Sequence, residues 1–114
     1  MSSSARRGEI WLVSFDPSVG SEIRKTRPAL VVSNDIANEN NSKVTLIPIT
    51  GTIVALPIVV IVQPDPENGL SKPSLIRVPD VTTFDKRRLR RKLGVLRPEQ
   101  LEEVARKLRA HLSL

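Results

Sequence analysis

Short runs of apolar and β-branched residues fill the first two thirds of the chain, and turn-forming residues separate them. These runs predict strands over residues 9–15, 27–34, 43–50, 56–63 and 74–78. Asp16, Pro17 and Ser18 predict a turn after the first strand, and the segment 64–69, PDPENG, predicts another before the fifth. Because no helix interrupts these strands, they favour an antiparallel sheet that curls into a small barrel.

The pattern changes to helical spacing from Pro98 onward. One face of this helix carries Leu101, Val104, Ala105, Leu108 and Leu112. Glutamates stand near its beginning and basic residues follow, as the helix dipole favours. We expect this helix to pack over one side of the sheet, with His111 at the surface or at an interface. The predicted fold class is therefore α+β and mostly β, with a C-terminal helix.

No charged residue occurs between Val44 and Pro64, a length that approaches a membrane-spanning helix. Pro48, Pro57 and Gly51 interrupt this stretch, and its β-branched residues favour strands. The sequence therefore predicts two buried strands here and no membrane contact.

Length indicates the number of domains, and charge indicates the kind of partner. The chain has 114 residues and predicts one domain over residues 1–114, with a flexible N-terminal tail over residues 1–6. Its net charge is +6 and its pI about 10.5, which suits an anionic partner. Six of the eight residues in 85–92, DKRRLRRK, are basic. Such a run is either a solvated face or a contact for nucleic-acid phosphates.

The chain has no cysteine and one histidine. It therefore lacks disulfides and thiol nucleophiles, a zinc site is disfavoured, and we expect neither a metal nor another cofactor. The short apolar run after Glu9 is too short for a signal peptide, so we expect a cytoplasmic protein. The side chains left that could take part in catalysis are those of arginine, lysine, the acidic residues, serine and threonine. They can stabilise phosphoryl transfer when the substrate supplies the nucleophile, as the 2′-hydroxyl of RNA does.

Five features in order carry a resemblance to a known family: Gly8 before a strand, the Asp16-Pro17 turn, the segment 20–22 (GSE), the pair 27–28 (RP) and the strand end 48–50 (PIT). Together with TTFDKRRLRRKLGVL at 82–96, they make nearly the whole chain resemble the MazF/PemK endoribonuclease toxins of bacterial type II toxin–antitoxin systems. The resemblance implies an SH3-like barrel, a homodimer, and cleavage of single-stranded RNA at short sequences without a metal.

The resemblance also implies roles for individual residues. The catalytic residues would be Arg27, Thr50 and Glu22. The substrate-binding residues would be Ser21, Arg24, Lys25, Lys72, Arg77, Arg87 and Arg88. Spacing alone is equally compatible with structural roles. Arg27 would then be a surface residue before a strand, Thr50 a turn former, and Glu22 their ion-pair partner. The chain departs from many members in having Asp80 and Thr82 where those have a glutamine and a basic residue.

The favoured hypothesis is a sequence-selective, metal-independent endoribonuclease toxin. Its expected partners are single-stranded RNA, a second copy of the chain, and a cognate antitoxin with a flexible acidic segment. One rival is a non-catalytic nucleic-acid-binding module, which the basic charge allows but the scarcity of aromatic residues disfavours. Another is a toxin that poisons DNA gyrase through a terminal helix, which needs a helix face free of the core.

Overall fold

The computed structural model describes residues 5–15, 26–53 and 57–114, and within them seven strands and two α-helices. The strands are β1 (Glu9–Ser14), β2 (Thr26–Val31), β3 (Lys43–Thr50), β4 (Val60–Val62), β5 (Ser74–Ile76), β6 (Thr82–Asp85) and β7 (Leu89–Val95). The helices are α1 (Asp35–Asn40) and α2 (Pro98–Leu112), with short 3-10 turns η1 (Val78–Asp80) and η2 (Lys86–Arg88). The predicted α+β, mostly β class is confirmed.

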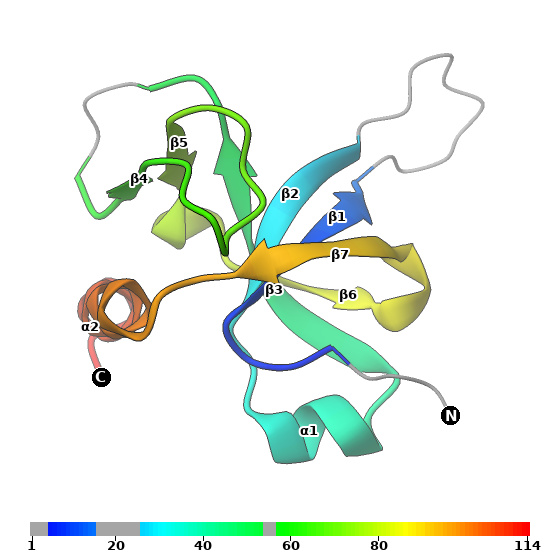
Figure 1. The fold of residues 1–114 in the computed structure, drawn as a ribbon. Coiled ribbons are helices and arrows are strands. Elements are labelled where there is room, and N and C mark those ends of the chain that lie inside the picture. Colours follow the sequence, from blue (N-terminus) through cyan, green and yellow to red (C-terminus); the bar gives the residue numbers. More distant parts are fainter. Residues whose placement is uncertain (1–4, 16–25, 54–56) are drawn as a thin grey trace.

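All strand pairs in the described part of the chain are antiparallel, in the order β4-β5-β3-β2-β1-β7. On the side of β3 away from β2, β6 pairs with the first half of β3 and β5 with its end. The long β3 therefore holds the sheet together at its centre (Figure 1). The strongly curved sheet does not close on itself, so "barrel" describes it only loosely.

Each face of the curved sheet carries its own apolar cluster. On β2, Leu30 belongs to the larger cluster, whereas Ala29 and Val31 belong to the smaller one. On β3, Ile47 and Ile49 belong to the larger cluster, and Val44 and Leu46 to the smaller. This two-residue alternation is what a strand buried on both faces requires.

Helix α2 covers the larger cluster, beside β4 (Figure 1). Val104 is fully buried, and Leu101 and Leu108 pack against the same cluster. Lys107 Nζ donates a hydrogen bond of 2.8 Å to the carbonyl of Val59, next to β4. The predicted helix and its apolar face are thus confirmed, and His111 is exposed.

Several boundaries differ from the predictions. The uncharged stretch does form strands, but the predicted fourth strand is only Val60–Val62, and residues 54–56 lie outside the described part. The predicted fifth strand ends at Ile76, and a 3-10 turn follows. Helix α1 and strands β6 and β7 were not predicted. Among the described residues, no helix is both long and apolar enough to cross a membrane.

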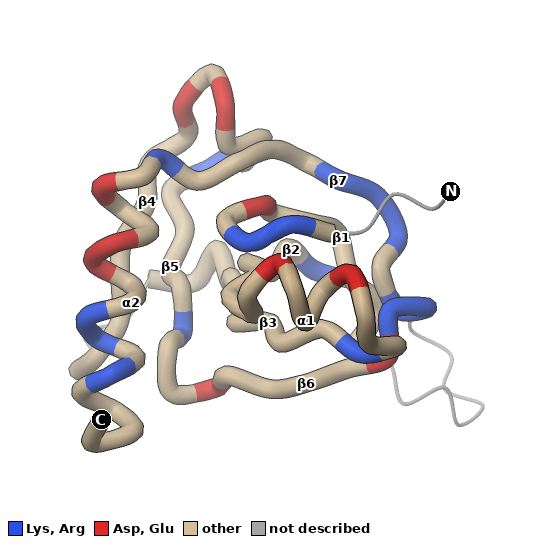
Figure 2. Tube along the Cα trace, turned by 90° about the horizontal axis from the view of Figure 1, so that it is seen from below, with Lys and Arg blue, Asp and Glu red and all other residues tan. Residues whose placement is uncertain are grey.

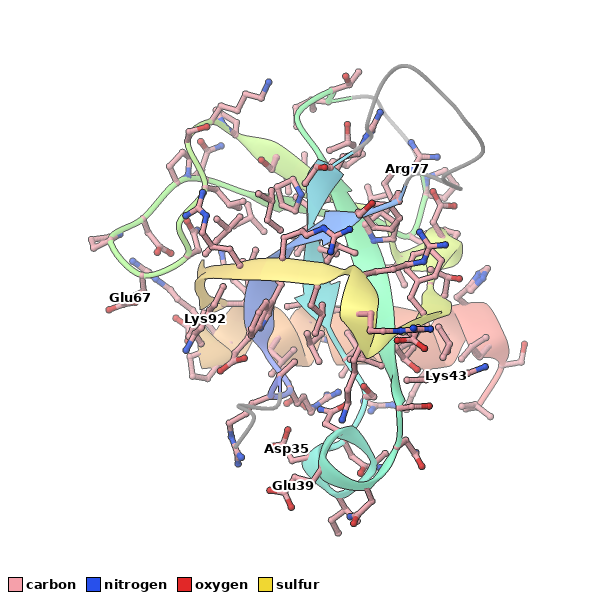
Figure 3. All side chains as sticks on the ribbon, turned by 90° about the vertical axis from the view of Figure 1, so that its right-hand side faces the viewer. Asp35, Glu39, Lys43, Glu67, Arg77 and Lys92 are labelled. Atoms are coloured by element: carbon pink, nitrogen blue, oxygen red, sulfur yellow. The ribbon has the colours of Figure 1, made fainter. Side chains whose placement is uncertain are left out.

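The start of the described chain is attached to the domain. Ala5 is buried in the smaller cluster, and Arg6 forms ion pairs with Asp35 (3.3 Å) and Glu39 (3.8 Å), which lie side by side on α1 (Figure 3). Of the tail expected over residues 1–6, these last two residues therefore pack onto the sheet and α1.

Candidate active site

Strands β2 and β3 bring Arg27 and Thr50 together. The two strands pair with Ala29 opposite Pro48. The pairing ends there, and Arg27 and Thr50 each lie two residues beyond this pair on their own strands. Both residues line one open pocket of about 330 Å³ at this end of the sheet. Two residues 23 positions apart in the sequence thus share one site because of strand register.

Thr50 is held so that its hydroxyl can act as a donor. Its Oγ1 accepts a hydrogen bond of 3.2 Å from the backbone N–H of Thr52, which also lines the pocket. This contact uses a lone pair and leaves the hydroxyl proton for another acceptor. Thr50 is half-buried and Arg27 is exposed, so a ligand in the pocket can reach both.

A third polar group, Lys72, comes from the loop before β5. Its side chain crosses Gly51 so closely that a Cβ there would lie 2.2 Å from Lys72 Cε and 2.8 Å from Nζ. The buried Ser74 donates its hydroxyl to the carbonyl of Lys72 at 2.9 Å, which fixes the backbone of this turn. The pocket therefore combines Arg27, Thr50 and Lys72, all three of them predicted site residues.

Four other predicted residues, Ser21, Glu22, Arg24 and Lys25, lie outside the described residues. They belong to the segment between β1 and β2, immediately before Arg27 in the sequence.

Arg77 is not among the residues that line this pocket. Its Nε donates to Asp80 Oδ2 at 2.7 Å, across the 3-10 turn η1. Both side chains are more than a third exposed (Figure 3 labels Arg77). Asp80, the residue that departs from the family pattern, thus has its charge balanced by the cation predicted to bind substrate.

Arg87 and Arg88 lie in the turn between β6 and β7, where Lys and Arg gather along β7 (Figure 2). Arg87 pairs with Asp85 at 3.1 Å, and this contact raises the pKa of Arg87. Hydrogen bonds from the backbone and side chain of Arg87 lower the pKa of Asp85. Arg88 donates to the carbonyl of Ser14 at 3.2 Å, and its guanidinium lies 5.1 Å from the centre of the Phe84 ring. Neither arginine is among the residues that line the Arg27–Thr50 pocket, but Ser14, which Arg88 contacts, pairs with Thr26 next to Arg27.

Comparison with known proteins decides the family. Residues 6–112 match the family described as "PemK-like, MazF-like toxin of type II toxin-antitoxin system". The chain belongs to the PemK/MazF toxin family. It is 32% identical over 114 residues to Endoribonuclease MazF9 of Mycobacterium tuberculosis strain H37Rv, covering 96% of this chain and 97% of the relative.

Solved structures agree with the PemK/MazF assignment. The M. tuberculosis toxin MazF-mt6 superposes with a TM-score of 0.77 at 27% identity, over 93% of this chain and 97% of its own. A crystal structure of MazE-MazF (Form-III) from Deinococcus radiodurans gives 0.80 at 26% identity, over 98% and 99%. The family predicted from the sequence is thereby confirmed.

Sequence reasoning missed two features beside the site of this PemK/MazF member. Gly51 lacks a side chain and so makes room for Lys72. The sequence pattern does not mark it as part of the site, because glycine is an ordinary residue in a turn. Arg91 lines a neighbouring pocket, yet in the sequence it is one of several arginines in a basic run. Among the described residues, no three Asp, Glu or His side chains gather into a group that could hold a metal.

Proposed function

We propose that this MazF-family endoribonuclease toxin cuts single-stranded RNA at selected sequences without a metal ion, using the RNA 2′-hydroxyl as the nucleophile. One observation carries the proposal: Arg27 and Thr50 line the same open pocket, with Lys72 beside them. A guanidinium, a hydroxyl donor and an ammonium around one cavity suit a phosphate whose negative charge grows during reaction.

The proposed reaction needs no protein nucleophile. The 2′-oxygen attacks the adjacent phosphorus, and the bond from phosphorus to the 5′-oxygen breaks. The 2′-proton goes to a base and the leaving 5′-oxygen gains a proton, so the products are a 2′,3′-cyclic phosphate and a 5′-hydroxyl. Arg27 stabilises the phosphorane through its donors and charge, and Thr50 donates to a non-bridging oxygen. Glu22 is the proposed proton acceptor or the group that orients Arg27.

Seven residues are proposed to bind the RNA around this centre: Ser21, Arg24, Lys25, Lys72, Arg77, Arg87 and Arg88. Lys72 is best supported, because it lines the pocket. Arg77 would exchange its ion pair with Asp80 for a phosphate, and the repulsion between Asp80 and RNA would then lower the gain.

Two protein partners complete the proposal. Solved relatives include one described as an endoribonuclease in complex with its cognate antitoxin, and we propose such a partner here, with a flexible acidic segment that competes with RNA at Arg27. We also propose a cytoplasmic homodimer, which light scattering at micromolar concentration would refute by finding only monomer.

Single-turnover cleavage of a short RNA tests the chemistry. By comparison with the loss of one oxyanion donor, Thr50→Ala should slow cleavage by roughly 10²–10³, with RNA binding only modestly weakened. Arg27→Ala should cost at least as much. Thr45→Ala is the matched control, because Thr45 lies on the same strand and its hydroxyl pairs with that of Thr83.

Three results would refute the mechanism. They are efficient cleavage of a substrate with a 2′-deoxy sugar at the scissile position, near-wild-type rates for Thr50→Ala and Arg27→Ala, and a Thr45→Ala variant as slow as Thr50→Ala. RNA that is bound but never cut would favour the rival binding module.

A further inference from the structure

A second pocket of about 360 Å³ adjoins the Arg27–Thr50 pocket. The two pockets share Pro28, Ile49, Gly51 and Lys72, so they are direct neighbours with a common wall. The volume falls within the range of about 300–1,000 Å³ that is common for ligand pockets. A group that is bonded to a ligand in the first pocket can therefore reach the second pocket.

The lining of the second pocket combines apolar walls with a few polar groups. Leu12, Leu70 and Leu93 contribute apolar surface, and Lys72 and Arg91 contribute positive charge. No carboxylate is among the described residues that line it. Apolar walls suit the flat faces of a base, and the two cations suit the phosphates on either side of one nucleotide.

The walls of this pocket are fixed before any ligand arrives. One wall is the loop between β4 and β5, which runs beside β7 (Figure 3 labels Glu67 on the loop and Lys92 on β7). Val95 donates its N–H to the carbonyl of Glu67 at 2.8 Å. Gly69 has a positive φ of 71°, and a Cβ there would lie 2.1 Å from the carbonyl oxygen of Leu93, so only glycine fits.

A β-bulge places Arg91 at the pocket. Leu12 pairs with Arg91 and Val13 with Leu89, so Arg90 is the extra residue on β7. Arg91 therefore lines the pocket together with Leu12, its partner across the sheet. Arg90, one residue away, donates to the carbonyl of Arg87 and is not among the lining residues.

We infer that the second pocket binds the nucleotide next to the scissile phosphate, with Arg91 on that nucleotide's outer phosphate. This inference rests on the proposed RNA cleavage at Arg27 and Thr50. It assigns Arg91, Leu12 and Leu93 to substrate binding, and it makes the shape of this pocket a determinant of which base is accepted beside the cut.

The test uses a short RNA centred on the mapped cleavage site, with a 2′-deoxy sugar at the scissile position to prevent cutting. Each phosphate that flanks the scissile one is replaced in turn by an uncharged methylphosphonate, and binding is measured by fluorescence anisotropy. At one of the two positions, wild-type affinity should fall roughly tenfold. Arg91→Ala should lose affinity for the unmodified RNA but show no further loss with this methylphosphonate. Arg90→Ala should keep the wild-type sensitivity.

A second arm tests the apolar part. Removing the base of the same nucleotide should weaken wild-type binding by about tenfold. Ser71→Phe, at an exposed lining position, should fill the pocket and abolish that sensitivity.

The inference would be overturned if the affinity losses from Arg91→Ala and from the methylphosphonate were additive at both positions. If the wild-type protein still cut the parent RNA, the proposed function would remain. Parent RNA that the wild-type protein leaves intact would overturn the proposed function and this inference with it.

Discussion

Replacing Asn68 by alanine should destabilise the protein by about 1–3 kcal/mol. Asn68 is fully buried in the loop between β4 and β5. Its Nδ2 donates to the carbonyl of Gln63 at 2.9 Å, and its Oδ1 accepts from Leu70 N–H at 2.9 Å and from Asp65 N–H at 3.3 Å. Leaving a buried backbone group without a partner costs about 1–3 kcal/mol. We count only the buried Leu70 N–H in full. The exposed Gln63 carbonyl and the half-exposed Asp65 N–H count little, because water can replace their bonds to Asn68.

Urea unfolding at neutral pH, followed by tryptophan fluorescence and circular dichroism, measures this free energy. The slope with urea should stay unchanged, because the variant still folds to the same structure. Asn40→Ala is the matched control: Asn40 is exposed and donates one hydrogen bond of 2.8 Å to the carbonyl of Ile36. The control should lose about 0.5 kcal/mol or less. Equal losses for Asn68→Ala and Asn40→Ala would refute the claim that this loop depends on buried hydrogen bonds.

Two further predictions concern charge and space. Partial burial raises the pKa of Glu9, but hydrogen bonds from Trp11 and the backbone of Arg6, together with Lys92, lower it more, so the net pKa lies below its ordinary value of 4.5. The ionised form therefore adds stability at neutral pH, and this stability is lost as pH falls below about 4.5 through the folded-state pKa. Glu9→Gln should be less stable than wild type at pH 7 and converge with it in acid; a constant difference in urea titrations would contradict this. Gly51→Ala should displace the end of Lys72, leave stability within about 0.5 kcal/mol, and slow cleavage no further in a Lys72→Ala background; additive effects would refute the contact.

The sequence predicts strands well where the apolar period is regular, and poorly where it is not. Strand β7 shows the reason. Its pairing with β1 shifts at two points, so its inward positions do not recur every second residue. Leu89 packs against the smaller cluster and Leu93, four residues later, against the larger one. Three basic residues stand between them, so the segment reads as a charged run. Strand β6 is short and only partly buried, which leaves an equally weak pattern.

For the candidate site too, some features could be predicted from the sequence and others could not. Arg27 and Thr50 could be predicted by resemblance to the family, and the structure brings them to one pocket. The pairing of Arg77 with Asp80 and of Arg87 with Asp85 could not, because which neighbouring carboxylate a surface arginine chooses depends on local backbone turns. Glu22 falls outside the described residues, so its role stays a prediction from the sequence.

The site also explains why core residues far from the pocket control it. Arg27 and Thr50 meet only while Ala29 stays opposite Pro48, and a shift of one residue would turn every side chain of β2 to the other face. Val31 and Leu46 oppose such a shift, because they pair across β2 and β3 and are both fully buried in the smaller cluster. Moving Val31 to the opposite face would break up this cluster and force Leu30 out of the larger one. Each burial is worth roughly 1.5–3 kcal/mol, so the two clusters together hold the register that places Arg27 and Thr50, the proposed catalytic pair.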